Sequence, residues 1–324
     1  MVTINNEIAN NMMRIAIAGS GGMAQILAHQ INETVHPFII LSRQARPDLE
    51  VHGYQVIVVN YDNQDDLRFH LRGIDLVIST VSGNPQINLI DAAANSHVQR
   101  FVPAEYQDKL GGRPTNDPLD RGRAASIERL RHWAHHARHR MQYTVFSCGV
   151  LYERFARGGL ASMDIGTSTA LGYQGSYLMN MENNTAEIVE HSSSGQPISV
   201  SMTSANDVAR FITAALDLDQ RRWPIEFRMQ GDRKTVTEIV QYAEVVKERQ
   251  FSTTLLAASA LPANLQEAAY YQDHAKAGRM QELMATEQRR YDFSQVNLNP
   301  LVDFQPISFW EWLSAHWAPV WMYQ

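Results

Sequence analysis

A short apolar run that leads directly into a cluster of glycines constrains this chain more than any other feature. Residues 15–18 read Ile-Ala-Ile-Ala, residues 19–24 read Gly-Ser-Gly-Gly-Met-Ala, and residues 25–31 have the pattern of a helix. Glycine permits a positive φ and a close approach of the backbone to a ligand. The new helix offers unpaired N–H groups and a positive dipole end to an anion. This order and spacing predict a binding site for a dinucleotide pyrophosphate.

Further apolar runs follow at the spacing of alternating strands and helices. They cover residues 38–43, 54–59, 73–80, 98–102 and 141–146. Helical patterns lie between them, including a short helix capped by Asp62 and a long one over residues 124–139. This alternation predicts an α/β fold with a Rossmann-type, doubly wound parallel sheet.

The pattern changes after residue 155. Residues 158–196 are rich in Gly, Ser, Thr and Asn, and capping boxes at residues 204–207 and 235–238 then open two helices. We therefore expect a dinucleotide-binding domain over residues 13–155. Residues 156–324 are expected to form mainly a smaller α+β cap that binds the substrate, with elements that return to the first domain.

The end of the second predicted strand indicates which dinucleotide binds. NAD-binding folds of this type place an acidic side chain there for the ribose 2′-hydroxyl. This chain has Ser42 and Arg43 instead. Because a guanidinium binds a phosphate through two parallel hydrogen bonds, we expect NADP(H) rather than NAD(H).

Composition excludes several other classes. The chain has 324 residues, 44% of them hydrophobic, and a net charge of −6, which gives no reason to expect a nucleic-acid or membrane partner. Its single cysteine, Cys148, excludes an internal disulfide framework and suits a reducing compartment. No apolar run is long enough to span a bilayer, and the polar residues 1–12 do not resemble a secretion signal. We expect a cytoplasmic monomer or homodimer that acts on a small molecule.

Four histidines in one helical segment raise the question of a metal site. His132, His135, His136 and His139 have the spacing of helix neighbours, but four arginines are interleaved with them. Cations repel a divalent ion, so we expect a solvated helix face and no metal. The sequence also has no G-x-S-x-G, H-E-x-x-H or P-loop motif.

Several segments together match one family in order and spacing. They are residues 19–22, 41–43, 73–80, 90–93, 100–106 (Arg-Phe-Val-Pro-Ala-Glu-Tyr), 143–144, 207–209 and 231–232. The chain resembles the NmrA-like branch of the atypical short-chain dehydrogenases, which includes isoflavone reductase, and is most similar in its second half to fungal members from secondary-metabolite pathways. The resemblance implies a Rossmann domain with a small cap, NADPH, and a cleft for an apolar, often aromatic substrate.

The resemblance also implies roles for individual residues. The predicted cofactor contacts are Gly19, Ser20, Gly21, Gly22 and Met23 at the pyrophosphate, Arg43 at the 2′-phosphate, Thr80, Val81 and Ser82 under the central portion, Pro103 and Ala104 with Glu105 and Tyr106 beside the nicotinamide ribose, and Ser147, Cys148 and Gly149 beside the ring. Tyr106, Tyr152 and Phe155 would line the substrate site.

One departure from the family concerns its catalytic lysine. Reductases of this family carry a lysine at the start of the helix that precedes the strand with Tyr143. The four lysines here all lie elsewhere, and the nearest counterparts are Arg121 and Arg123. Arginine does not readily release a proton, although it can bind a hydroxyl or an anion. Tyr106 is therefore the predicted acid, with Lys109 and Glu105 as further candidates and Arg123 as a fixed cation.

Three functions follow from this pattern. The first is an NADPH-dependent reductase of a small, largely apolar secondary metabolite, acting on a C=C, iminium or benzylic acceptor. The altered lysine position motivates the second, an isomerase or cyclase that retains NADP(H) without net redox change. The third is a non-enzymatic regulator that senses NADP, as the family's namesake does.

Overall fold

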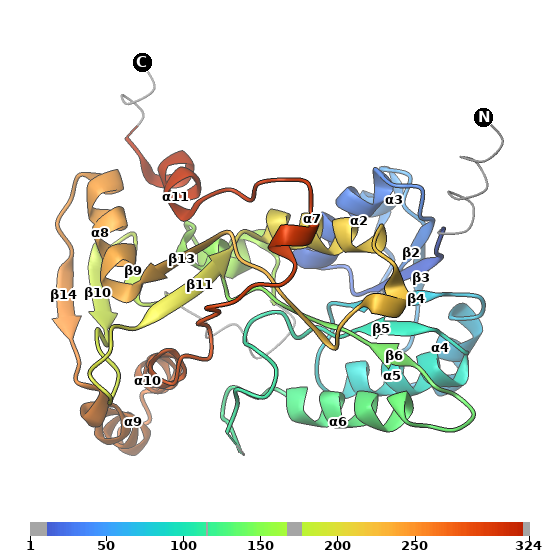
Figure 1. The fold of residues 1–324 in the computed structure, drawn as a ribbon, viewed down its shortest axis with the longest axis horizontal. Helices are drawn as coiled ribbons and strands as arrows, with labels where there is room; N and C mark the ends of the chain where they lie inside the picture. Colours follow the sequence, from blue (N-terminus) through green and yellow to red (C-terminus); the bar gives the residue numbers. More distant parts are fainter. Residues whose placement is uncertain (1–11, 115, 167–176, 320–324) are drawn as a thin grey trace. The chain divides into compact units, whose positions relative to one another are not determined.

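The chain forms two compact units. The computed structural model describes residues 12–114, 116–166 and 177–319, so residues 1–11 of the polar N-terminal segment lie outside it. The first unit comprises residues 1–106, 120–146 and 209–227, and the second comprises residues 107–119, 147–208 and 228–324 (Figure 1). The domain boundary expected near residue 155 stays a prediction.

The first unit is built on a six-stranded sheet in the order β3-β2-β1-β4-β5-β6. Every pairing is parallel, which confirms the predicted Rossmann-type, doubly wound fold. The strands are β1 (Ile15–Ala18), β2 (Phe38–Ser42), β3 (Val56–Val58), β4 (Leu76–Ser79), β5 (Arg100–Val102) and β6 (Gln142–Tyr143). The strand order reverses between β1 and β4, and ligands of such sheets bind beyond the carboxyl ends of the strands at that point.

Helices cover both faces of this sheet. They are α2 (Gly22–Asn32), α3 (Pro47–Glu50), α4 (Gln64–His70), α5 (Asn84–Asn95) and α6 (Arg123–Ala134), with α2 on one face and α4, α5 and α6 on the other (Figure 1). Two local predictions were wrong. Asn63 rather than Asp62 caps α4, because its side chain accepts the N–H groups of Asp65 and Asp66. Helix α6 ends at Ala134, where the Nδ1 atom of His135 bonds the carbonyl of Arg131.

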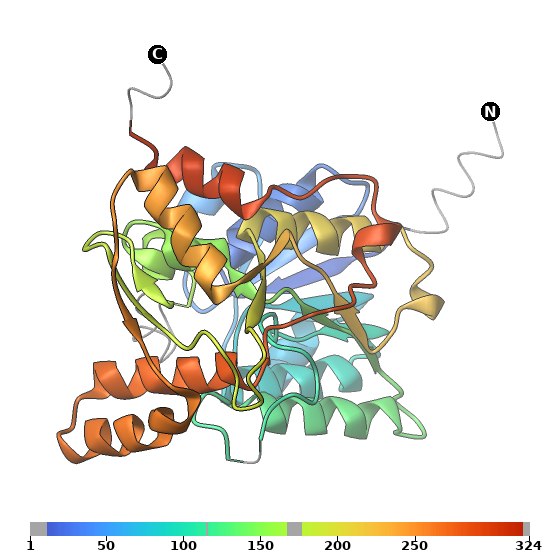
Figure 2. The ribbon, with the colours of Figure 1, turned by 60° about the vertical axis from the view of Figure 1, so that its left-hand side comes forward.

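The second unit contains two small mixed sheets and most of the later helices. Strand β11 (Ser199–Thr203) lies between β8 (Val150–Leu151) and β13 (Asp232–Thr235), and β10 (Thr185–Ile188) lies between β9 (Met179–Asn180) and β14 (Ser252–Leu255). The helices are α8 (Val236–Lys247), α9 (Leu261–Tyr270), α10 (His274–Glu287) and α11 (Phe309–Trp317). Helices α9 and α10 lie side by side (Figure 2). The predicted capping box of Thr235 and Glu238 opens α8.

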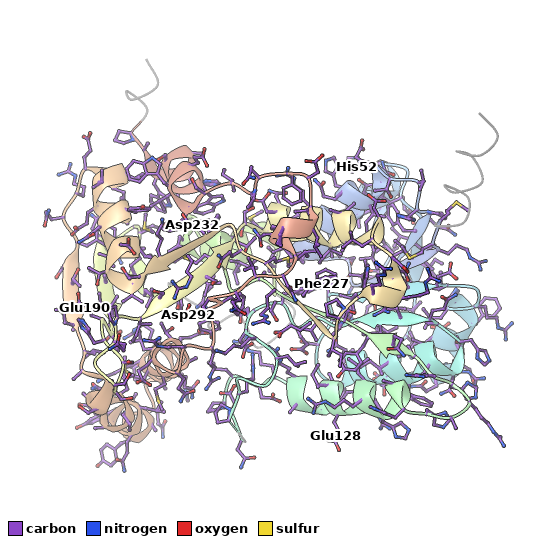
Figure 3. All side chains as sticks on the ribbon, viewed as in Figure 1. His52, Glu128, Glu190, Phe227, Asp232 and Asp292 are labelled. Carbon is purple, nitrogen blue, oxygen red and sulfur yellow. The ribbon has the colours of Figure 1, made fainter. Side chains whose placement is uncertain are left out.

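The remaining elements are short or lie where the chain passes between units. Strand β7 (Val145–Ser147) pairs with β12 (Glu226–Arg228), and α7 (Ala205–Leu216) follows β11. Five short 3-10 helices complete the described elements: η1 (Tyr152–Phe155), η2 (Gly159–Met163), η4 (Gln220–Arg222), η5 (Ala258–Ala260) and η6 (Asn299–Leu301). On the second unit, Asp232 and Asp292, labelled in Figure 3, pair with Lys234 and Arg233 of β13.

A buried arginine anchors residues 209–227 within the first unit. The Arg100 side chain on β5 donates to the Thr144 hydroxyl at 2.8 Å and to the Gln220 carbonyl at 2.7 Å. Its guanidinium also lies over the Trp223 ring, 5.2 Å from the centroid. Burial lowers the pKa of Arg100. Neutral oxygens and an aromatic face thus stabilise this charge.

A buried carboxylate caps α7. Both oxygens of Glu153, which is 1% exposed, accept the N–H of Ala205, at 2.9 and 3.0 Å. The Ser204 hydroxyl accepts the N–H of Asp207, as the predicted capping box requires. Burial raises the pKa of Glu153 to about 7, and the nearby charge of Asp207 acts in the same direction. The start of α7 therefore depends on an acid whose ionised form is disfavoured.

Candidate active site

The turn between β1 and α2 requires glycine at its first position. Gly19 has a φ of +104°, and a Cβ at this residue would overlap the hydroxyl oxygen of Thr80. That hydroxyl is fixed, because it donates to the carbonyl of Ala18 at 2.8 Å. The backbone at the end of β1 therefore packs against the Thr80 side chain that follows β4, and position 19 has no space for a larger residue.

The start of α2 is suited to an anion. Gly21 occupies the N-cap position in an extended conformation and has no side chain with which to cap the helix. The N–H groups of the first turn of a helix have no partner within the helix, and the helix dipole adds partial positive charge. The predicted residues Gly22 and Met23 form this first turn. This arrangement fits the pyrophosphate of a dinucleotide.

Polar side chains gather where β2 ends. The hydroxyls of Ser20 and Ser42 lie 3.0 Å apart and join the glycine turn to β2. Arg43 is exposed next to Ser42. Its charge opposes the effect of burial on Tyr61, whose pKa is nevertheless raised and whose hydroxyl donates to the Leu41 carbonyl. The predicted 2′-phosphate residue is thus beside the turn and open to solvent.

Sequence reasoning missed a second arginine at this place. Arg46 donates from Nη1 to the carbonyl of Ser20, within the glycine turn, and its Nη2 lies 2.7 Å from an oxygen of Asp48. The loop between β2 and α3 visibly contained two arginines. Only the contact across the sheet edge distinguishes Arg46 from an ordinary exposed cation.

The end of β4 continues the same edge. Thr80, Val81 and Ser82 are partly buried there, and Gly83 follows with a φ of +70° as the N-cap of α5. A Cβ on Gly122, the N-cap of α6, would lie 3.1 Å from the Cα of Gly83. The starts of α5 and α6 therefore meet beside the β4 loop.

The predicted residues after β5 are held by a fully buried glutamine. Gln86 accepts the N–H of Ala104 at 2.7 Å and donates to Glu105 at 3.1 Å and to the Ser126 hydroxyl at 3.0 Å. Pro103 is buried and Ala104 is partly buried. Gln86 therefore fixes the turn that leads to Tyr106, and only the long-range contact could identify it.

Two predicted catalytic residues form a buried pair with each other. Glu105 is 7% exposed and Arg123 is 5% exposed, and an Nε–Oε distance of 3.5 Å separates them. The hydroxyl of Tyr106 donates to the carbonyl of Ser79 at 2.7 Å, so this side chain lies at the carboxyl end of β4. The first unit thus brings Tyr106 to the same sheet edge as the glycine turn and places Arg123 opposite a carboxylate.

The remaining cofactor predictions belong to the second unit. Cys148 is buried, and burial raises the pKa of its thiol. Ser147 donates from its hydroxyl to the Asp108 carbonyl, and Gly149, with a φ of +71°, has the Ser201 carbonyl where a Cβ would stand. These three residues form a tightly packed turn.

The loop that carries Lys109 is fixed by ion pairs within the second unit. Arg113 binds both oxygens of Asp108, at 2.7 and 2.8 Å, and Arg290 binds Asp117 at 2.7 Å. The Lys109 N–H donates to the Arg290 carbonyl. The backbone position of Lys109 is therefore set by its own unit.

The predicted substrate residues Tyr152 and Phe155 lie in the core of the second unit. Tyr152 is 0% exposed, and its hydroxyl donates to the Ile307 carbonyl at 3.2 Å. Phe155 is 1% exposed and packs against Phe309. Their role toward a substrate stays a prediction.

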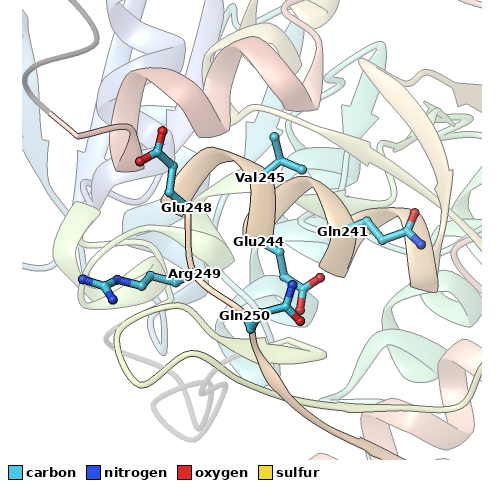
Figure 4. Close-up of a pocket in the computed structure, with 6 residues that line it drawn as sticks. All are labelled: Gln241, Glu244, Val245, Glu248, Arg249 and Gln250. Atoms are coloured by element: carbon cyan, nitrogen blue, oxygen red, sulfur yellow. The ribbon is translucent and has the colours of Figure 1, made fainter.

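A pocket of about 480 Å³ lies at the end of α8, and its lining includes none of the predicted site residues (Figure 4). Gln241, Glu244, Val245, Glu248, Arg249 and Gln250 line it. Within residues 12–114, 116–166 and 177–319, no group of three His, Cys, Asp or Glu side chains is placed to hold a metal ion. No helix in the described part of the chain is long and apolar enough to cross a membrane.

Comparison with known proteins supports a dinucleotide site at this edge of the sheet. A family model described as NAD(P)H-binding matches residues 18–169. Oxidoreductase BOA1 of Botryotinia fuckeliana is 24% identical over 253 residues, which are 72% of this chain and 75% of that protein.

Two solved structures share the fold. Pinoresinol-lariciresinol and phenylcoumaran benzylic ether reductases, described with their relationship to isoflavone reductases, align with a TM-score of 0.69 at 16% identity over 94% of this chain and 99% of theirs. The triphenylmethane reductase of Citrobacter sp., complexed with NADP(H), aligns with a TM-score of 0.67 at 13% identity over 94% of this chain and 99% of its own. The chain therefore contains a segment that matches the NAD(P)H-binding family model, and it is similar in sequence to a fungal oxidoreductase and in fold to the isoflavone reductase-like enzymes.

Proposed function

We propose that this protein is an NADPH-dependent reductase of a small, largely apolar secondary metabolite. The observation that carries the proposal is the first turn, where Gly19 packs against Thr80 and the N-terminus of α2 is left for an anion. A glycine turn that runs from a parallel strand into a helix N-terminus is the arrangement that binds a dinucleotide pyrophosphate. The names of the compared proteins, three of them reductases, support the class of reaction.

Residues of the first unit would hold the cofactor. Ser20, Gly21, Gly22 and Met23 would bind the pyrophosphate with backbone N–H groups, and Arg43 would bind the 2′-phosphate. The absence of an acidic side chain at the end of β2 favours NADPH over NADH. When bound, NADPH supplies a hydride.

Tyr106 is the proposed proton donor. A phenol hydroxyl can release a proton to a reduced product, and the Tyr106 hydroxyl lies at the same sheet edge as the glycine turn. Arg123 cannot take this role, because a guanidinium keeps its proton and this one faces Glu105. Its proposed role is to hold the Glu105 carboxylate in place, next to Tyr106 in the chain. Lys109 is the second candidate for a proton donor.

The substrate class follows from the missing lysine. Reduction of an iminium carbon needs no proton at the acceptor carbon, so such an acceptor tolerates the replacement of the family's lysine by arginine. Conjugated C=C and benzylic acceptors need a donor and would rely on Tyr106. We therefore place aromatic iminium compounds first among the substrates to be tested.

The test is hydride transfer from labelled cofactor. NADPH deuterated at both C4 positions of the nicotinamide is incubated with the protein and a panel of aromatic iminium, enone and benzylic ether compounds, and products are analysed by mass spectrometry. The proposal expects one deuterium per product molecule and an equal loss of the NADPH absorbance. Turnover of a compound with no net loss of NADPH would instead identify an isomerase or cyclase.

A further inference from the structure

The carbonyl of the glycine turn holds an arginine that no sequence motif assigns. Arg46 reaches from the loop before α3 to the Ser20 carbonyl, and its side chain is 23% exposed. The Ser20 and Ser42 hydroxyls are in contact at the same place. Two guanidinium groups, those of Arg43 and Arg46, therefore flank the end of β2 within the first unit.

Asp48 binds this arginine in the geometry that a phosphate would use. Its Oδ1 lies 2.9 Å from Nε of Arg46, and its Oδ2 lies 2.7 Å from Nη2. Pro47 starts α3 and sets Asp48 in the first turn. A guanidinium binds a carboxylate or a phosphate through the same pair of parallel donors.

The two hydrogen-bond partners of Arg46, the Ser20 carbonyl and the Asp48 carboxylate, differ in how rigidly they are held. The Ser20 carbonyl is part of the backbone of a tightly packed turn, whereas the Asp48 side chain is 58% exposed. An exposed carboxylate exchanges readily with water and contributes little to stability. Arg46 is thus anchored on the turn side and exchangeable on the solvent side.

We propose that Arg46 is a second binding group for the 2′-phosphate and that Asp48 competes with this phosphate for the same guanidinium. The inference rests on the proposed NADPH dependence. A phosphate monoester carries a charge of about −1.5 to −2 near neutral pH, so it binds Arg46 more strongly than a single carboxylate does. The Asp48 carboxylate also repels it. Asp48 therefore lowers the affinity for NADPH and leaves that for NADH unchanged.

Calorimetric titration of the full chain tests this competition. The ligands are NADPH, NADH and adenosine 2′,5′-bisphosphate, which carries the 2′-phosphate without the nicotinamide. Asp48→Asn should tighten the binding of NADPH and of the bisphosphate about three- to tenfold, as expected for removal of one charge a few ångströms away in a solvated site. Arg46→Ala should weaken both about tenfold or more, and NADH should change less than about twofold in either variant.

Asp65→Asn is the matched control, because Asp65 is 94% exposed and pairs with Arg68 at 3.7 Å on α4. It should leave all three affinities unchanged. If Asp48→Asn weakens the binding of NADPH, or Arg46→Ala lowers the affinities for NADPH and NADH equally, the inference is wrong. The wild-type preference for NADPH would in that case still support the proposed function. A wild type that binds NADH as tightly as NADPH overturns both.

Discussion

Replacement of Gly19 by alanine tests the packing on which the cofactor site is built. The residue has a φ of +104°, a region that costs an L-residue about 1–2 kcal/mol. The new Cβ would also overlap the Thr80 hydroxyl, which is bonded to Ala18 and cannot simply rotate away. Forced overpacking of this kind costs about 1–3 kcal/mol. We expect Gly19→Ala to lower the free energy of unfolding by about 2–5 kcal/mol in all.

A second glycine separates the two contributions. Gly53 has a φ of +83°, and a Cβ there would meet nothing within 4 Å. Gly53→Ala should therefore cost only the backbone term, about 1–2 kcal/mol. Urea unfolding followed by circular dichroism measures both variants, and NADPH titration should show weaker binding for Gly19→Ala alone.

A double variant identifies Thr80 as the obstacle. Thr80→Ala alone should cost about 0.5–1.5 kcal/mol for one lost hydrogen bond. Combined with Gly19→Ala, it should cost less than the sum of the two single changes, because the overlapping hydroxyl is gone. Equal costs for Gly19→Ala and Gly53→Ala, together with an additive double variant, would refute the reasoning.

Three further changes probe the supporting structure. The pKa of Glu153 is raised to about 7 from 4.5, so the folded state keeps a proton that the unfolded state loses, and stability should fall by about 3 kcal/mol as the pH rises from 4.5 to 7. Glu153→Gln should remove this pH dependence when urea unfolding is measured across that range, and an unchanged pH dependence of stability would contradict the prediction. Arg100→Met removes two charge-assisted hydrogen bonds, to the Thr144 hydroxyl and the Gln220 carbonyl, and should cost about 2–4 kcal/mol in chemical unfolding, whereas a loss below about 1 kcal/mol would contradict the anchoring role. Arg123→Met removes the cation that faces the buried Glu105 carboxylate and should cost about 3–5 kcal/mol, part of which the Glu105→Gln/Arg123→Met double variant should recover; no recovery would exclude the pair as the cause.

Local sequence patterns predicted the sheet and its first turn well. Apolar runs and glycines report backbone geometry over a few residues, so β1, its turn and α2 could be placed before the structure was known. Helix ends were harder, because the choice between Asp62 and Asn63 as a cap depends on which side chain meets two N–H groups.

Contacts between distant residues could not be predicted in this way. Gln86 bonds Ala104 and Ser126, and Arg46 bonds Ser20, across separations of 18 to 40 residues. No spacing rule connects such positions, since the fold alone brings them together. The same limit applies to Tyr152, because its hydroxyl bonds the carbonyl of Ile307, 155 residues away along the chain.

Comparison of NADPH and NADH binding in the wild type and in Arg43→Ala tests the central claim most directly. Calorimetry on the full chain should give one site, with NADPH bound at least about tenfold more tightly than NADH. Arg43→Ala should lose most of that preference and keep its affinity for NADH, because only the contact to the 2′-phosphate is removed. An Arg43→Ala variant that binds NADPH as tightly as the wild type would contradict the account.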